Sequence, residues 1–369
     1  MPINMNAAIK LPFIAKTSLL LIGIYVFVLM LSIGQGIIVP LIFGTIIAIV
    51  LHPVVNFFVR KKINRILAII ITLLLSLALL GAFGMFIFSQ LSRFSESWPV
   101  FVEKITGLIN ETIDWVPGYF DISAGKVNAW MIETKADLLD SSSSVIGQTL
   151  ISAGNGMVAV FLVPVYIFLI LFYQPLLMEF IHQLFGADRR SKVTVIVTQT
   201  KTVVQRYLIG LFIEFVLVAI LDSVGLLILG IDYAILIGVL GALLNLIPYI
   251  GGLIAVAIPM MIALVTKDSP WFALYVMAVY YTIQLIDNNY IVPKIVASKV
   301  KINALVSIVA VLAGGALWGV AGMFLSIPLT AIIKVICDHI DPLKPIGYLL
   351  GDTMPVIAIF KIRKKEIKK

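Results

Sequence analysis

The stretch AILIGVLGALLNLIPYIGGLIAVAIPMMIALV, residues 234–265, decides how this chain folds. It carries no charged residue, and it is longer than the roughly 20 residues that a helix needs to cross a bilayer. Pro248, Gly251 and Gly252 interrupt it near its middle. It can therefore form one long kinked helix, or a re-entrant hairpin that returns to the side it came from.

A second apolar run, residues 303–336, is interrupted by Gly314, Gly315 and the segment 319–322. Each broken run follows an apolar segment, residues 207–229 and 271–291 respectively. The chain thus contains a weak repeat of a span and a broken segment, in opposite orientations. Paired broken segments indicate a transporter's substrate site. Proline and glycine kinks that only shape packing are the alternative.

The composition of the whole chain indicates a membrane protein. Hydrophobic residues make up 61% and charged residues 12%, whereas about 25% are charged in a soluble domain. Further apolar runs cover residues 18–33, 37–51, 66–88 and 157–173. The first two are separated only by residues 34–36, which predicts a tight hairpin. We expect an all-α polytopic membrane protein with about eight membrane segments, two of them re-entrant hairpins in an inverted repeat.

Charge gives the orientation, because cytoplasmic loops are rich in lysine and arginine. Basic clusters in residues 60–65, 175–206 and 361–369 indicate that both termini are cytoplasmic in a bacterial inner membrane. The cytoplasmic side also receives Lys294, Lys299 and Lys301, but only if both broken runs are hairpins. This favours the hairpins over full spans.

The acidic stretch 90–148 predicts an amphipathic helix on the outer face, kinked at Pro99. It can bind a partner or the membrane surface, or pack on its own protein. The expected divisions are membrane helices in 1–89, the outer segment 90–150, a fourth helix with a cytoplasmic amphipathic segment in 151–206, the inverted repeat 207–340 and a basic tail 341–369.

Several function classes find no support in the sequence. Cys337 is the only cysteine, the three histidines are scattered, and no phosphate-binding loop or dinucleotide fingerprint occurs. We therefore expect no metal, no cofactor and no enzymatic activity. The basic tail is expected to lie beside anionic lipid and not to bind nucleic acid.

The sequence resembles the autoinducer-2 exporter family of bacterial membrane proteins. The resemblance is carried by QRYLIG at 205–210, NLIPYIGG at 245–252, YIVPKI at 290–295, and the Gly-Gly, Trp-Gly and Ile-Pro-Leu elements of 313–330. It implies an eight-segment protomer, a pentamer and an elevator-like movement of the repeat. Family members look like exporters of autoinducer-2, and others behave like sodium/proton antiporters.

Ionisable groups inside membrane segments are costly and usually functional. Asp287 is the strongest candidate for the solute or ion pathway, because Gln284, Asn288 and Asn289 surround it in the sequence. The alternative is that this polar group caps a helix end. Glu214 and Asp222 in the fifth helix are further candidates, although Glu214 can instead contact a neighbouring subunit.

The breaks in the two apolar runs are the other candidate positions. Asn245 and Tyr249 can contact a solute at the first tip, where Pro248, Gly251 and Gly252 form the turn. Gly319 and Gly322 are the corresponding residues of the second tip. Glycine lets backbone approach a solute closely, but it also permits a tight turn or close helix packing.

Three functions remain open from the sequence. The first is a secondary carrier that exports a small polar solute such as autoinducer-2. The second is a sodium/proton antiporter on the same fold, with a monovalent cation or proton as its partner. The third is a non-transporting membrane scaffold that uses the outer segment.

Overall fold

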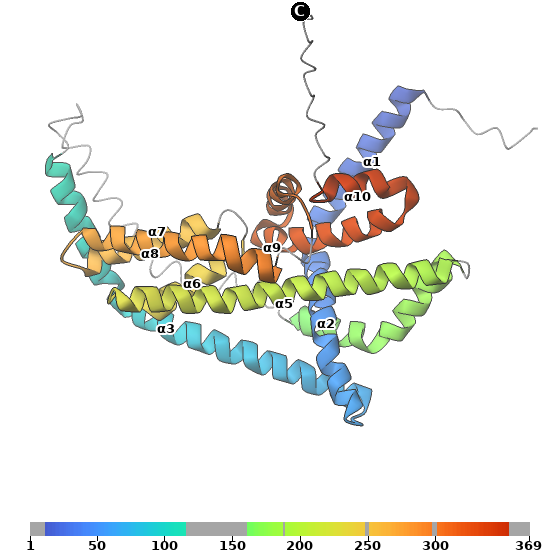
Figure 1. The fold of residues 1–369 in the computed structure, drawn as a ribbon, viewed down its shortest axis with the longest axis horizontal. Coiled ribbons are helices and arrows are strands. Elements are labelled where there is room, and N and C mark those ends of the chain that lie inside the picture. Colours follow the sequence, from blue (N-terminus) through green and yellow to red (C-terminus); the bar gives the residue numbers. More distant parts are fainter. Residues whose placement is uncertain (1–11, 116–160, 187–188, 248–250, 297–300, 354–369) are drawn as a thin grey trace, which may run out of the picture.

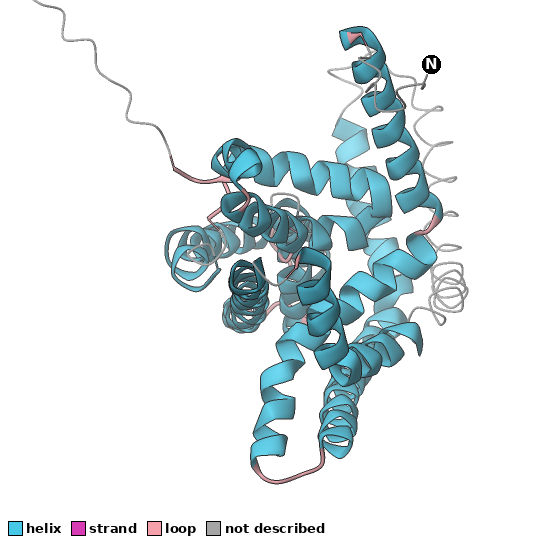
Figure 2. Ribbon diagram, turned by 90° about the vertical axis from the view of Figure 1, so that its right-hand side faces the viewer, coloured by secondary structure: helices cyan, strands magenta, loops and turns pink. Residues whose placement is uncertain are grey.

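A computed structural model describes residues 12–115, 161–186, 189–247, 251–296 and 301–353 of the protein. Within these ranges the chain is helical almost throughout, and the only strand pairing there is an isolated bridge between Ile302 and Gly351. Figure 2 shows the helices joined by short loops. The prediction of an all-α fold is confirmed.

Six helices of the described chain are long and apolar enough to cross a bilayer, and they carry many exposed large apolar side chains. Lipid solvates such surfaces, whereas water does not. The prediction of a polytopic membrane protein is therefore confirmed. The six are α1 (Phe13–Ile33), α2 (Gln35–Arg60), the segment Arg65–Phe94 of α3 (Arg65–Trp115), the helix Phe161–Phe185, α5 (Arg190–Ile228) and α9 (Ala304–His339).

The predicted tight hairpin of the first two apolar runs is wrong. Only Gly34 separates α1 from α2, and its backbone angles, φ −79° and ψ 5°, stay near helical values. A single residue in this conformation bends the chain but does not reverse it, since a reversal needs a loop of about 2–5 residues. Figure 1 shows α1 leading into α2 without returning alongside it. The N-terminal orientation that the hairpin implied loses this support.

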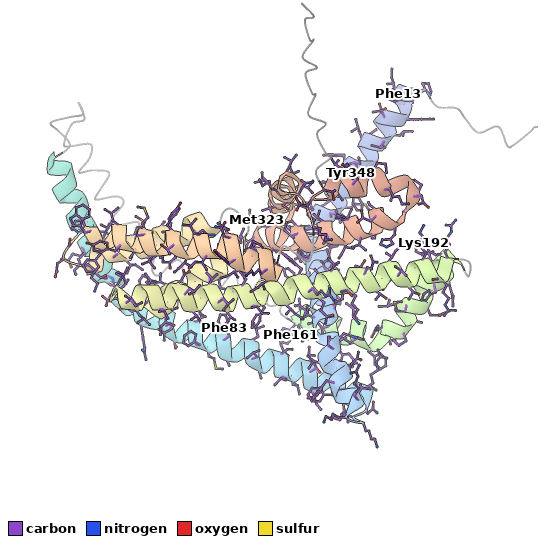
Figure 3. The ribbon with its side chains drawn as sticks, in the orientation of Figure 1. Phe13, Phe83, Phe161, Lys192, Met323 and Tyr348 are labelled. Carbon is purple, nitrogen blue, oxygen red and sulfur yellow. The ribbon has the colours of Figure 1, made fainter. Side chains whose placement is uncertain are left out.

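Helix α1 buries none of its residues against the part of the chain that the structure describes. Phe13 at its first turn is 83% exposed and stands clear of the other helices in Figure 3. A described contact to the rest of the chain is the hydrogen bond from Trp318 Nε1 to the Leu31 carbonyl, 3.0 Å. Among the described residues, α1 therefore keeps an exposed apolar surface that lipid can solvate.

Two helices continue through boundaries that the sequence suggested. Helix α3 runs through Pro99 to Trp115, so the start of the expected outer segment extends the third span. Helix α5 joins the basic stretch from Arg190 to the apolar residues up to Ile228. Arginine, lysine and glutamate have good helix propensity, so a change in polarity need not end a helix. The remainder of the outer segment, residues 116–150, lies outside the described residues.

The first broken run forms two short helices that pack on each other, α6 (Ala234–Asn245) and α7 (Gly251–Thr266). A Cβ atom at Gly251 would overlap the Leu244 carbonyl, so the two backbones nearly touch at the turn. Helices α6 and α7 share a buried cluster with α8 (Trp271–Ile286) that includes Ile237, Ile262 and Val276.

The second broken run folds back on itself inside α9. The backbone leaves the helical region at Trp318 and Gly319, where the glycine has φ 61°. Gly314 and Gly322 then meet face to face, because a Cβ on either one would overlap the carbonyl of the other. Residues eight apart on a straight helix would be about 12 Å apart, so the two halves of α9 form a folded pair.

The remaining elements close the fold around α5. Helix α8 passes directly into a π-helix, η3 (Asp287–Val296), and α9 is followed by η5 (Asp341–Leu343) and α10 (Lys344–Leu350). Helix α5 contacts α2, α6, α8, η3 and α9, and in Figure 1 it runs along the length of the molecule. It is the helix against which both broken runs are packed.

Candidate functional site

A cavity of about 830 Å³ lies where both broken runs meet α5, α8 and η3. Its polar lining comes from every one of these elements, from the segment that precedes α9, and from Asp352 near the C-terminal end of the described chain. The polar residues that line it are Tyr207, Glu214, Asn245, Tyr280, Tyr281, Gln284, Asp287, Asn288, Lys301, Ser307 and Asp352. Most of the sequence-predicted pathway is therefore gathered in one place.

Asp287 lies at the wall of this cavity and is only 2% exposed. It is the first residue of η3, at the point where α-helical pairing changes to π-helical pairing. Asn245 Nδ2 donates a hydrogen bond to Asp287 Oδ2 at 3.1 Å, whereas Oδ1 has no partner in the described chain. A buried oxygen without a partner is costly, and a proton, cation or solute hydroxyl at Oδ1 would remove that cost.

The Asn245–Asp287 bond also links the first broken run to the junction between α8 and η3. Asn245 is the last residue of α6 and Asp287 is the first of η3. The Asp287 backbone N–H bonds to the carbonyls of Ile283 and Gln284, whereas the last carbonyls of α6 have no partner within that helix. Such ends survive at membrane depth only where protein or a water-filled cavity meets their polar groups.

The other two predicted carboxylates lie at different depths. Glu214 is 6% exposed and lines the cavity directly from α5. Asp222 is also buried but does not line the cavity. It faces Gly241 together with Tyr280, since a Cβ on that glycine would lie 3.4 Å from Asp222 Oδ2 and 3.3 Å from the Tyr280 hydroxyl.

Tyr280 lies between the cavity and the buried position of Asp222. Its ring lines the cavity, while its buried hydroxyl has no hydrogen-bond partner in the described chain. Asp287 Oδ1 and the Tyr280 hydroxyl are therefore two buried polar atoms without partners, and the hydroxyl faces the same glycine of α6 as Asp222.

The polar residues around Asp287 separate into two groups. Gln284 and Asn288 both line the cavity, and Gln284 Nε2 donates to Asn288 Oδ1 at 3.4 Å. Asn289 instead donates to the Leu285 carbonyl at 2.8 Å and is exposed outside the cavity. The structure thus brings Gln284 and Asn288 to Asp287, but not Asn289.

The two glycines of the first break differ in what they contact. Gly252 lines the cavity, and a Cβ there would lie 3.0 Å from Gln284 Oε1 and 3.4 Å from Asn245 Oδ1. Gly251 faces the Leu244 carbonyl and therefore serves the turn. Pro248 and Tyr249, the other predicted tip residues, lie outside the described residues.

The glycines of the second break are not part of the cavity lining. Gly319 has no atom within 4 Å of an added Cβ, and its positive φ explains the need for glycine. Gly322 packs on Gly314. Their described roles are the turn and close packing, and α9 contributes Ile327 to the cavity from its second half.

Some lining residues were missed by the sequence analysis. Tyr280, Gln284, Asp287 and Asn288 follow a spacing of four, three and one residues, which places them on one helix face, and this signal was available for Tyr280. Lys301 and Asp352 reach the cavity from segments distant in sequence. No local pattern marks them.

The comparisons with known proteins agree with this arrangement. The sequence profile described as AI-2E family transporter matches residues 18–341. The AI-2 transport protein TqsA of Escherichia coli (strain K12) is 25% identical over 346 residues, which cover 90% of this chain and 95% of that protein. YrrI of Bacillus subtilis (strain 168) is 25% identical over 319 residues, or 83% of this chain and 87% of the relative.

The family match covers both broken runs and every residue of the cavity lining except Asp352. It also agrees with the apolar helices of a multi-pass protein in the bacterial inner membrane. The chain belongs to the AI-2E transporter family.

Proposed function

We propose that this transporter exports a small polar solute through the cavity at Asp287, with autoinducer-2 as the first candidate. The observation that carries the proposal is the cavity of about 830 Å³ between the two broken runs, with a buried, half-satisfied carboxylate in its wall. Its volume falls within the range of about 300–1,000 Å³ that is usual for small-molecule sites. The similarity to TqsA motivates the choice of autoinducer-2.

The lining suits a solute rich in hydroxyl groups. Asn245, Gln284 and Asn288 offer amide donors and acceptors, and Asp287 offers a free acceptor oxygen. Tyrosine rings at 280 and 281 supply apolar faces beside them. Polar groups on an otherwise apolar wall fix the orientation of a ligand.

The proposed mechanism treats both broken runs as re-entrant hairpins. Helices α6 and α7, with 12 and 16 residues, would measure about 18 and 24 Å. Both are shorter than the roughly 30 Å hydrocarbon core. With the folded pair of α9 this gives about eight membrane segments in an inverted repeat and a cytoplasmic C-terminus, and we propose an elevator-like movement of the repeat. By the family resemblance we also propose a homo-pentamer, in which the unpacked α1 would find protein contacts.

Sodium/proton antiport on the same fold is the second candidate. The observation that favours it is the set of three buried carboxylates, Glu214, Asp222 and Asp287. No lysine or arginine of the described chain forms an ion pair with any of them. Such groups can carry protons or bind a monovalent cation.

Reconstituted vesicles distinguish the two candidates. Export predicts that autoinducer-2 crosses the membrane of vesicles that contain the protein, and that empty vesicles do not pass it at the same rate. Antiport predicts that a sodium gradient moves protons, measured with a pH-sensitive dye inside the vesicles. Both assignments fail if vesicles with the protein move autoinducer-2 no faster than empty vesicles and a sodium gradient moves no more protons than in empty vesicles.

A further inference from the structure

A second polar site lies away from the transport cavity, between α2, the start of α3, the helix Phe161–Phe185 and α5. Two adjoining cavities of about 370 and 280 Å³ share His52 and Asn56 in their walls. Neither shares a residue with the cavity at Asp287. We call the two together the basic cleft.

The charge in the basic cleft has one sign. Arg60 and Lys201 line its first part and Arg65 lines the second, and no aspartate or glutamate lines either. None of these three cations takes part in an ion pair within the described chain. Glu179, an acid on an adjacent helix, is bound to Arg190 at 3.1 Å. The cleft therefore holds positive charge that no described carboxylate neutralises.

The cleft's hydrogen-bond donors are held in place. Lys201 Nζ lies 2.8 Å from His52 Nδ1, and Asn56 Nδ2 lies 3.1 Å from the same nitrogen. Both partners are donors, so Nδ1 is the acceptor of a neutral imidazole. Lys201 uses one ammonium hydrogen on this bond and keeps two for a ligand.

Arg65 is fixed in a similar way. Its Nη2 donates to the Leu171 carbonyl at 2.8 Å and to Gln174 Oε1 at 3.2 Å. A guanidinium has five hydrogens in a planar fork, so it can still donate to an anion. Preorganised donors lose little freedom when a ligand binds.

The position of the cleft indicates what supplies the anion. Arg60 ends α2 and Arg65 begins α3, so the cleft lies at the ends of two apolar spans, where lipid headgroups are found. Phe57 lines the same cleft and is 56% exposed. Fixed cations beside exposed apolar surface match the phosphate and the acyl chains of a phospholipid.

We propose that the basic cleft binds a phosphate group, supplied by an acidic phospholipid of the surrounding leaflet. Lys201 and Arg65 donate to the phosphate oxygens, and His52 and Gln174 hold these two side chains in position. The proposal does not depend on which solute the transporter moves.

Native mass spectrometry of the full-length protein, mixed with phosphatidylglycerol and phosphatidylcholine, tests the proposal. We expect wild type to retain phosphatidylglycerol in preference, and Lys201→Gln to weaken that preference about tenfold, the size expected for one charged hydrogen bond. Lys201→Arg keeps the charge and should retain most of the preference. Lys62→Gln removes an equal charge near the cleft but outside its lining, and it should match wild type.

Calorimetry with inorganic phosphate on delipidated protein identifies the source. Weak phosphate binding that phosphatidylglycerol displaces supports the lipid. Tight phosphate binding with no lipid preference supports the phosphate site and assigns it to the free ion. Absence of binding to both overturns the proposal, as does an equal loss in Lys201→Gln and Lys62→Gln. If Lys201→Gln does not fold, Arg65→Gln takes its place with the same expectations.

Discussion

At the scale of single residues, the structure separates groups that the sequence could only place near one another. Asp287 was identified because polar residues cluster around it in an apolar span, and the structure adds its bond to Asn245 and its free Oδ1. The sequence could not predict which carboxylate oxygen is free, because the bond to the other oxygen comes from Asn245, which lies 42 positions away.

Asp287→Asn is expected to reduce flux at least about tenfold, because it removes the charge and one acceptor from the cavity wall. The amide occupies the same volume and can still accept the bond from Asn245, so thermal stability in detergent should change little. Vesicle flux and size-exclusion profiles measure the two effects. Asp268→Asn, at an exposed position, is the control. Flux at the wild-type level in Asp287→Asn would exclude this carboxylate from the pathway.

The adjacent glycines 251 and 252 should respond differently to alanine. In Gly252→Ala the new Cβ meets the ends of the flexible Gln284 and Asn245 side chains, so flux should fall while stability is nearly kept. In Gly251→Ala it meets the Leu244 carbonyl, which costs about 1–3 kcal/mol of overpacking. Vesicle flux and detergent melting temperatures, with Gly84→Ala in open space as the control, measure both. Equal effects at both glycines would contradict this division of roles.

At the scale of helices, the sequence predicts which segments are broken but not how they join. Pro248, Gly251 and the glycines near 319 correctly marked the two interruptions, because helix breakers act locally. The bend at Gly34 was predicted wrongly as a reversal, since glycine permits both and only the neighbouring packing selects one. The extensions of α3 and α5 were missed because polarity, unlike backbone conformation, does not limit helix length.

The folded pair within α9 depends on the backbone contact between Gly314 and Gly322. A methyl group on either residue would push the halves apart, and we expect Gly314→Ala and Gly322→Ala each to cost about 1–3 kcal/mol. Gly319→Ala should cost on the order of 1–3 kcal/mol through its backbone conformation alone, because φ 61° with ψ −143° lies near a region that essentially only glycine adopts. Melting temperatures in detergent compare these variants with Gly81→Ala, where nothing contacts an added Cβ. Unchanged melting of Gly314→Ala and Gly322→Ala would mean that the halves are not held at this contact.

At the scale of the whole molecule, the orientation in the membrane is a proposal that labelling can test. Two re-entrant hairpins place the loop before α8 outside, and they place the end of η3 with Lys294 and the segment before α9 with Lys301 inside. An impermeant thiol reagent should then label Ser269→Cys in intact cells but not Ser298→Cys, a position outside the described residues. Both variants are made with Cys337→Ala, and permeabilised cells serve as the labelling control. Labelling of Ser298→Cys from outside would support full spans.

The fold also contains a closed ring of chain. Asn303 Nδ2 donates to the carbonyls of Leu349, 2.7 Å, and Gly351, 2.9 Å, while Ile302 pairs with Gly351. These hydrogen bonds join the two ends of the segment that contains the folded α9 pair and α10. Lys301 precedes these hydrogen bonds in the chain, Asp352 follows them, and both residues line the cavity. Because this closed segment joins the rest of the chain beside the cavity, we expect a displacement of the α9 pair to change the lining of the cavity as well.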